Sequence, residues 1–137
     1  MKCLIVEDDF TARKLLQMHL SEYGDCFVAV NGQEAIDAVL EALEQRHPYD
    51  LICLDIMMPG VDGQQTLQAI RQIEQEYGKY EQEGAKVIMT TVLSDPENIR
   101  DSFKMGCESY IVKPIKKEKL LHELANLNLI KLEEVSK

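Results

Sequence analysis

The sequence is poor in basic residues and has no long hydrophobic run. It contains 15 Lys and Arg and 24 Asp and Glu, which give a net charge of −9. Such a charge argues against binding to nucleic acid phosphates or to an anionic membrane surface. No apolar stretch approaches the roughly 20 residues that span a bilayer, and the first residues show no signal-peptide pattern. We therefore expect a cytoplasmic protein that contacts neither nucleic acid nor membrane.

The four cysteines are too far apart in sequence to form a CxxC metal or redox pair. Cys3, Cys26 and Cys53 lie in short apolar runs, which favours buried free thiols in a reducing compartment. Hydrophobic residues make up 45% of the 137 residues, enough for one packed domain. We expect this domain to span residues 1–126, followed by a helix extension or tail over 127–137.

Short apolar runs alternate with segments of helical spacing along the chain. The runs are short enough for strands covered on both faces of a sheet; they are Cys3–Val6, Cys26–Val30, Leu51–Leu54, Val87–Met89 and Tyr110–Val112. Helix starts are indicated by Asn31 with Glu34, and by Asp95 before Pro96. Strict alternation predicts an α/β fold, a doubly wound five-stranded parallel sheet with five helices.

Polar residues follow four of these runs. In open parallel sheets, ligands bind beyond the carboxyl ends of the strands, so these positions should converge. They are Glu7, Asp8 and Asp9 after the first run, Asp55 after the third, Thr90 and Thr91 after the fourth, and Lys113 after the fifth.

This set of side chains suggests phosphoryl chemistry with a divalent cation. Carboxylates held together repel unless a cation joins them, and oxygen-only ligands suit Mg²⁺. An Asp carboxylate can also act as a nucleophile and form an aspartyl phosphate. Each acid taken singly is more often a helix cap or a solubilising loop residue than part of such a site. Asp55 is the exception, because a lone carboxylate at the end of a buried strand is costly.

Taken together, the motifs resemble those of response-regulator receiver domains. The resemblance runs in order from about Lys2 to Leu124 and rests on Leu4–Asp9, Asp55–Gly63, Thr91 and Lys113–Pro114. It implies a flavodoxin-like receiver fold, resembling a stand-alone chemotaxis regulator. It also implies a phosphoacceptor in a two-component phosphorelay, which catalyses only its own phosphorylation and dephosphorylation and is otherwise not an enzyme. The implied partners are a sensor histidine kinase or histidine phosphotransfer protein, and an unidentified downstream protein. The implied assembly is a monomer or a weak dimer.

The resemblance assigns roles residue by residue. Asp55 corresponds to the phosphoacceptor, and Glu7 and Asp8 to the acidic pair. Mg²⁺ would be bound directly by Asp8, Asp55 and the Met57 carbonyl, and by Glu7 through a water. The remaining positions correspond to a switch hydroxyl, a switch ring and a lysine that pairs with the phosphoryl group and precedes a cis peptide bond to proline; they are Thr91, Tyr110 and Lys113.

Several positions depart from the family pattern. Val92 follows Thr91 where the family usually has a smaller residue, and residues 78–84 lengthen the region of the third helix. Apolar Met57 and Leu93 flank the site and cannot orient a water, so we expect slow self-dephosphorylation. Ser109 stands where DNA-binding members often have an acid, which favours a stand-alone receiver.

A cluster of basic residues is expected on the face formed by the fourth helix, fifth strand and fifth helix. The face could bind a partner, or could be an ordinary solvated lysine face; its residues are Arg100, Lys104, Tyr110, Lys116, Lys117 and Lys119. The apolar residues after Asn126 could pack back on the domain or dock a partner.

Three other classes fit less well. A dehalogenase-like phosphatase would need a second Asp two residues after the nucleophile, where this chain has Met57. A flavodoxin-like cofactor binder would need a phosphate loop after the first strand, where Glu7, Asp8 and Asp9 would repel phosphate. A receiver that serves only as an unphosphorylated scaffold remains open.

Overall fold

Five strands and five helices alternate along the chain, as the sequence predicts. The computed structural model describes residues 1–78, 84–92 and 94–131. The elements are β1 (Lys2–Val6), α1 (Phe10–Leu20), β2 (Asp25–Ala29), α2 (Gly32–Glu44), β3 (Leu51–Asp55), α3 (Gly63–Glu76), β4 (Lys86–Thr91), α4 (Pro96–Lys104), β5 (Ser109–Val112) and α5 (Lys117–Asn126).

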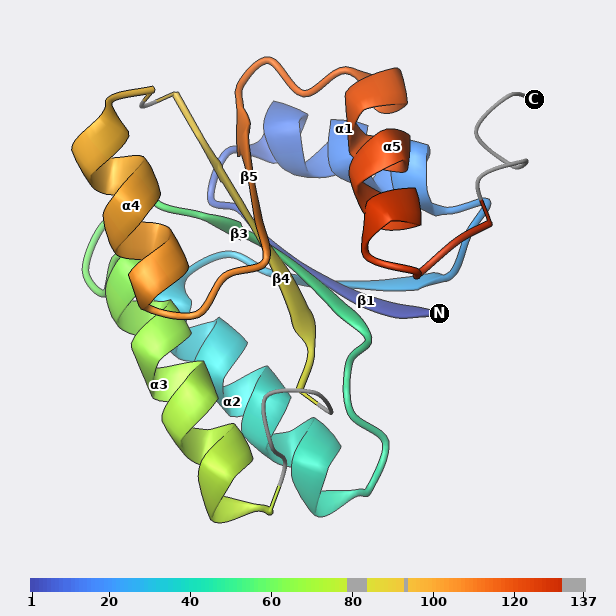
Figure 1. Ribbon diagram of the computed structural model, residues 1–137. Helices are drawn as coiled ribbons and strands as arrows, with labels where there is room; N and C mark the ends of the chain where they lie inside the picture. The colour runs from blue at the N-terminus through green and yellow to red at the C-terminus, as the bar shows by residue number, and fades with distance from the viewer. Residues whose placement is uncertain (79–83, 93, 132–137) are drawn as a thin grey trace.

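The strands form one parallel sheet in the order β2-β1-β3-β4-β5, with helices on both faces (Figure 1). Helices α1 and α5 cover one face, where Leu16, Leu20 and Leu120 pack against Ile5 and Ile88. Helices α2 and α3 cover the other. The fold class is therefore confirmed. Among the described helices, none is long and apolar enough to cross a membrane.

The helix starts follow from their capping residues. Asp9 accepts a hydrogen bond from the Ala12 amide at 2.8 Å, and Asp95 accepts one from Asn98 at 3.1 Å, with Pro96 as the first helical residue. The Asn31 side chain caps α2 as predicted. Each cap fixes the residue at which its helix begins and therefore the residue at which the preceding loop ends.

One strand is less buried than its apolar run predicts. In β2, Phe27 is 47% exposed and Val28 is 44% exposed, because β2 is an edge strand with β1 as its partner. Cys26 is accordingly only half-buried, whereas Cys3, Cys53 and Cys107 are buried thiols. The prediction that all five runs are covered on both faces is wrong for β2, since hydrophobicity alone does not distinguish an edge strand from a central one.

After α5 the described chain turns back toward the domain. Leu127, Leu129 and Ile130 pack against the cluster beneath α1 and α5, and the Leu129 amide donates to the Leu124 carbonyl at 2.9 Å. Residues 132–137 and most of the 78–84 stretch lie outside the described residues.

Candidate phosphoacceptor and metal site

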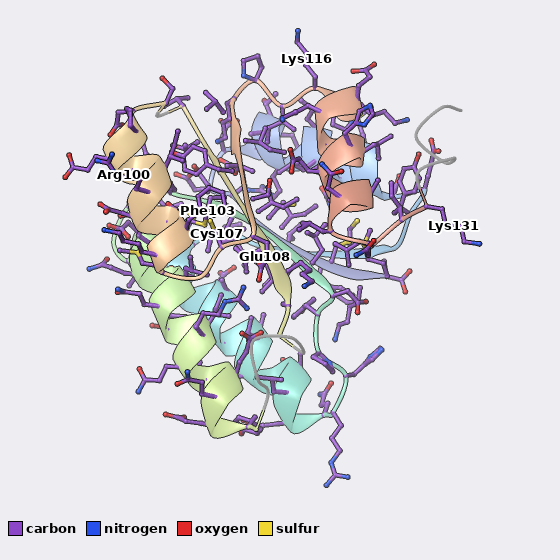
Figure 2. The ribbon with its side chains drawn as sticks, in the orientation of Figure 1. Arg100, Phe103, Cys107, Glu108, Lys116 and Lys131 are labelled. Carbon is purple, nitrogen blue, oxygen red and sulfur yellow. The ribbon has the colours of Figure 1, made fainter. Side chains whose placement is uncertain are left out.

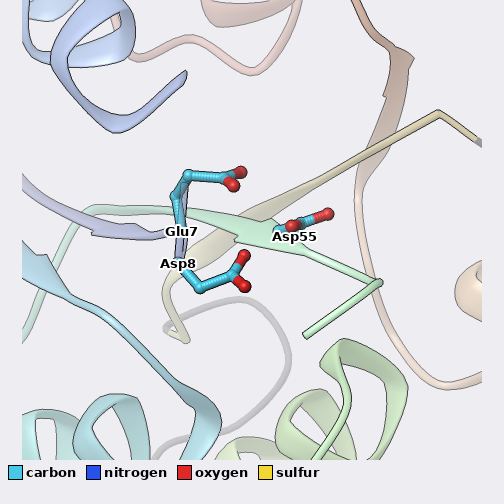
Figure 3. Close-up of side chains that lie close together, drawn as sticks. All are labelled: Glu7, Asp8 and Asp55. Atoms are coloured by element: carbon cyan, nitrogen blue, oxygen red, sulfur yellow. The ribbon is translucent and has the colours of Figure 1, made fainter. Parts of the chain in front are cut away.

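Three carboxylates converge at the carboxyl edge of the central strands. Glu7 and Asp8 follow β1, and Asp55 is the last residue of β3. One oxygen from each lies within 4.8 Å of the others, and Figure 3 shows the three side chains close together. Glu7 and Asp55 are buried, at 0% and 3% exposure, while Asp8 is exposed. The cluster is therefore open to solvent on the Asp8 side.

Lys113 supplies the positive charge of this cluster. Its ammonium lies 2.7 Å from Glu7 Oε2 and 3.5 Å from Asp55 Oδ2. The lysine follows β5, its amide donates to the Thr91 carbonyl at 2.7 Å, and its peptide bond to Pro114 is cis. One ammonium thus faces three carboxylates, which leaves the cluster with excess negative charge.

Burial dominates the electrostatics of Asp55. Its pKa is raised from 3.8 to about 6, first by loss of water around the carboxylate and second by the Glu7 carboxylate, while Lys113 opposes the rise. Burial lowers the pKa of Lys113, but its hydrogen bond to Glu7 and the Asp55 charge outweigh that effect and raise it. A cation bound among the acids would favour their charged forms.

The loop after β3 is held close to Asp55. The Met57 amide donates to Asp55 Oδ1 at 3.2 Å, and the Gly63 amide donates to the Ile56 carbonyl at 2.9 Å. A Cβ atom at Gly63 would overlap the Asp55 carbonyl oxygen and Ile56 Cα, so only glycine allows this approach. Asp62 and Gln65 form a capping box at the start of α3. The loop therefore has little freedom to carry Met57 away from the acids.

The other predicted residues surround the acids. Thr91 is buried at the end of β4, and Tyr110 on β5 is half-buried against the core beneath α2 and α3. Met57 is 54% exposed and Val92 is 65% exposed, so both lie at the surface of the site. Leu93 lies outside the described residues.

The basic residues on the α4–β5–α5 face are spread over several elements. Figure 2 shows Arg100 pointing away from α4 and Lys116 pointing away from the loop before α5. Lys119 pairs with Glu123 at 3.0 Å, and Lys117 lies 3.7 Å from Glu22. Two of the lysines are therefore partly neutralised by acids of the same domain.

Comparison with known proteins decides the family. The family model described as "Response regulator receiver domain" matches residues 3–125. The chain belongs to this family. It is 39% identical over 114 residues to the transcriptional regulatory protein ResD of Bacillus subtilis, covering 82% of this chain and 42% of ResD. The chain spans less than half the length of the curated relatives it matches.

Solved receiver structures have the same fold. The chemotaxis protein CheY4 of Vibrio cholerae aligns with a TM-score of 0.75 and 28% identity, over 91% of this chain and 96% of that one. The receiver domain of the histidine kinase CKI1 from Arabidopsis thaliana, complexed with Mg²⁺ and BeF₃⁻, aligns with a TM-score of 0.76 and 27% identity, over 98% and 89% of the chains. This protein thus contains a receiver domain of two-component response regulators.

Proposed function

We propose that this receiver domain accepts a phosphoryl group on Asp55 from the phosphohistidine of a histidine kinase or phosphotransfer protein. The observation that carries the proposal is the buried Asp55 carboxylate, with Glu7 and Asp8 oxygens within 4.8 Å and the Lys113 ammonium at 3.5 Å. A buried acid surrounded by more acids is destabilised unless a cation joins them, and a cation bound there can in turn attract an anionic phosphoryl group.

The donor set fits Mg²⁺. All available ligands are oxygens, and their charge exceeds what Lys113 neutralises. Asp8, Asp55 and the Met57 carbonyl would bind the ion directly, and Glu7 would bind it through a water. Bound there, Mg²⁺ would neutralise the carboxylates and draw in phosphoryl oxygens.

The transfer step follows from the position of Asp55. One carboxylate oxygen attacks the phosphorus atom of phosphohistidine, forming a P–O bond as the P–N bond breaks. The electron pair of the broken bond stays on the imidazole nitrogen, which takes a proton from water. Lys113 then pairs with the phosphoryl oxygens, and in this proposal its ammonium leaves Glu7 to do so.

Helix α4 is suited to transmit a conformational change from the phosphorylated site because it is weakly held to the rest of the domain. Ser102 is its one fully buried residue among those described. Gln64 ties it to α3 through long hydrogen bonds of 3.2 Å to the Ser102 hydroxyl and 3.5 Å to the Asn98 carbonyl. We propose that Thr91 moves toward the phosphoryl group, that Tyr110 follows, and that α4 shifts with them.

We further propose that output is by protein contact through the α4–β5–α5 face, from a stand-alone receiver in the cytoplasm. Ser109, where DNA-binding members often have an acid, donates to Glu123 of α5 at 2.7 Å and is 5% exposed. A buried hydroxyl offers no charge for a dimer contact. In this proposal the domain catalyses only its own phosphorylation and dephosphorylation.

Intact mass after incubation with phosphoramidate tests the proposal. We expect the parent to gain one phosphoryl group only when Mg²⁺ is present, and Asp55→Asn to gain none. Asp25→Asn, an exposed acid at the opposite edge of the sheet, is the matched control and should behave as the parent. A gain that persists in Asp55→Asn, or no gain in the parent, would overturn the proposal, and the latter outcome would favour an unphosphorylated scaffold.

A further inference from the structure

Thr90 presents a buried hydroxyl next to the phosphoacceptor. In the sheet register, Thr90 of β4 lies opposite Asp55 on one side and Ile111 on the other. Side chains alternate along a strand, so Thr90 shares a face with Ile88, and Asp55 shares that face with Cys53; Ile88, Cys53 and Ile111 belong to the core beneath α1 and α5. The Thr90 and Asp55 side chains are therefore neighbours on one face of the sheet.

This hydroxyl is an exception to the usual pairing of buried polar groups. Thr90 is 0% exposed, and within residues 1–78, 84–92 and 94–131 its Oγ1 is the one buried side-chain oxygen or nitrogen with no hydrogen-bond partner. An unpaired buried hydroxyl destabilises the state that contains it, whereas valine has the same shape without that cost. The unpaired Thr90 hydroxyl therefore lowers the stability of this conformation, and a second conformation in which the hydroxyl is hydrogen-bonded would not carry that cost.

The Lys113 side chain reaches from the end of β5 across the end of β4 to the acids. Lys113 follows β5 and is two residues beyond Ile111, which puts it on the same face. Its ammonium reaches Asp55 on β3 and Glu7 beyond β1, and β4 lies between β5 and β3. When the ammonium leaves Glu7 for a group on Asp55, it moves back toward its own strand, and Thr90 lies in that direction.

We propose that Thr90 is a positioning residue for the phosphorylated state, in which its Oγ1 accepts a hydrogen bond from the Lys113 ammonium. The inference rests on the proposed phosphorylation of Asp55. In the conformation described here, Lys113 donates to Glu7 and Thr90 has no described partner. In the phosphorylated state, Lys113 donates to the phosphoryl group and to Thr90. The hydroxyl therefore favours the phosphorylated state, because only that state pairs it.

The test compares the affinity for beryllofluoride, a phosphoryl mimic, in the presence of Mg²⁺. Thr90→Val keeps the side-chain shape and removes the hydroxyl, while Thr90→Ser keeps the hydroxyl. We expect Thr90→Val to bind beryllofluoride about tenfold more weakly and to lose its phosphoryl group faster, as one hydrogen bond to a charged group predicts. We expect Thr90→Ser to retain the parent affinity within about threefold.

Urea unfolding without Mg²⁺ separates this role from a structural one. Thr90→Val should unfold at the same or a higher urea concentration than the parent. Thr66→Val is the matched control, since Thr66 is equally buried but its hydroxyl donates to the Asp62 carbonyl at 2.8 Å. Thr66→Val should lower the unfolding midpoint.

Three results would overturn the inference while leaving phosphorylation of Asp55 intact. They are parent-like beryllofluoride affinity in Thr90→Val, an equal loss in Thr90→Ser, and a drop in the Thr90→Val midpoint as large as that of Thr66→Val. A parent protein that binds no beryllofluoride and accepts no phosphoryl group would instead overturn the proposed function, and this inference with it.

Discussion

Two clusters of charged side chains lie at opposite edges of the sheet and differ in how their acids are paired. At the carboxyl edge, Glu7, Asp8 and Asp55 face the single ammonium of Lys113. At the amino edge, the Arg71 guanidinium pairs with Glu74 at 2.6 Å and with Glu108 at 2.9 Å.

Backbone groups complete the Arg71 cluster. The guanidinium also donates to the Gly106 and Ala85 carbonyls. The Ala85 amide donates to Glu74 at 2.8 Å, and the Val87 amide donates to Glu108 at 2.6 Å. Each acid there has the Arg71 cation and a backbone amide donor at 2.8 Å or less. At the carboxyl edge, Glu7 and Asp55 share the one Lys113 cation, and their backbone donors, the Asp9 and Met57 amides, are both at 3.2 Å. We infer that the Arg71 cluster holds α3, β4 and β5 together, and that the other cluster is left incomplete for a cation and a phosphoryl group.

Arg71→Ala should give the largest loss of stability. It would leave two largely buried carboxylates without a cation, which costs roughly 3 kcal/mol of unfolding free energy. Urea unfolding measures the loss, and the difference from the parent should be the same with and without Mg²⁺, because the metal would bind at the other edge in both proteins. The exposed Arg100→Ala is the control and should change stability by less than about 0.5 kcal/mol. A loss below about 1 kcal/mol in Arg71→Ala would mean that its ion pairs contribute little.

Asp55→Asn should stabilise the metal-free protein above pH 6. The folded-state pKa of Asp55 is about 6, above its ordinary value of 3.8. A raised carboxyl pKa means that this group's contribution to stability is complete below pH 3.8 and is lost as the pH rises through about 6. The variant should therefore gain up to about 3 kcal/mol at pH 7.5 and nearly nothing at pH 3.5.

Unfolding free energies of both proteins across this pH range measure the difference. Asp25→Asn, whose carboxylate is exposed, should show no such pH-dependent gain. A gain for Asp55→Asn that is the same at both pH values would contradict a raised Asp55 pKa.

Mg²⁺ should stabilise the parent through the carboxyl-edge cluster alone. At ten times its dissociation constant, a ligand specific for the folded state adds about 1.4 kcal/mol. Thermal unfolding with and without Mg²⁺ should show this gain in the parent and in Arg71→Ala, and should show it reduced in Asp8→Asn. Equal stabilisation of Asp8→Asn and the parent would remove Asp8 from the metal site.

Polar residues at the two flanking positions should speed dephosphorylation. Met57 is 54% exposed beside the acids and cannot orient an attacking water. The double substitution Met57→Asn with Leu93→Glu should shorten the phosphoryl lifetime several-fold, roughly 1 kcal/mol in barrier height. Decay of the phosphorylated mass after removal of the donor measures it, and an unchanged decay rate would show that these side chains do not limit hydrolysis.

The sequence predicted the fold because its signals are local. Apolar runs, capping residues and strict alternation suffice for a doubly wound sheet, and the fold class and family are both confirmed. Strand ends also predicted that Glu7, Asp8 and Asp55 would meet, since parallel strands share a carboxyl edge, whereas Asp9, expected at the same edge, caps α1 instead. The roles of Glu7, Asp8, Met57, Thr91 and Lys113 remain predictions that the experiments above address.

The features that could not be predicted from the sequence depend on contacts between elements that are distant in the chain. Arg71 and Glu108 are 37 positions apart, and nothing in their local sequence marks them as a pair. The exposed side of β2 depends on its place in the strand order. In the sequence, nothing distinguishes Thr90 from other polar residues at strand ends. Its unpaired hydroxyl and its position opposite Asp55 are evident only in the structure.

Amide NMR spectra in Mg²⁺, with and without beryllofluoride, test the central claim most directly. If the carboxyl-edge cluster is the phosphoacceptor switch and the Arg71 cluster is a fixed support, the amides of Asp55, Thr91, Tyr110 and α4 should shift on adding the mimic. The amides of Ala85 and Val87 at the other cluster should stay in place. Shifts confined to the Arg71 cluster, or no shift near Asp55, would contradict the claim.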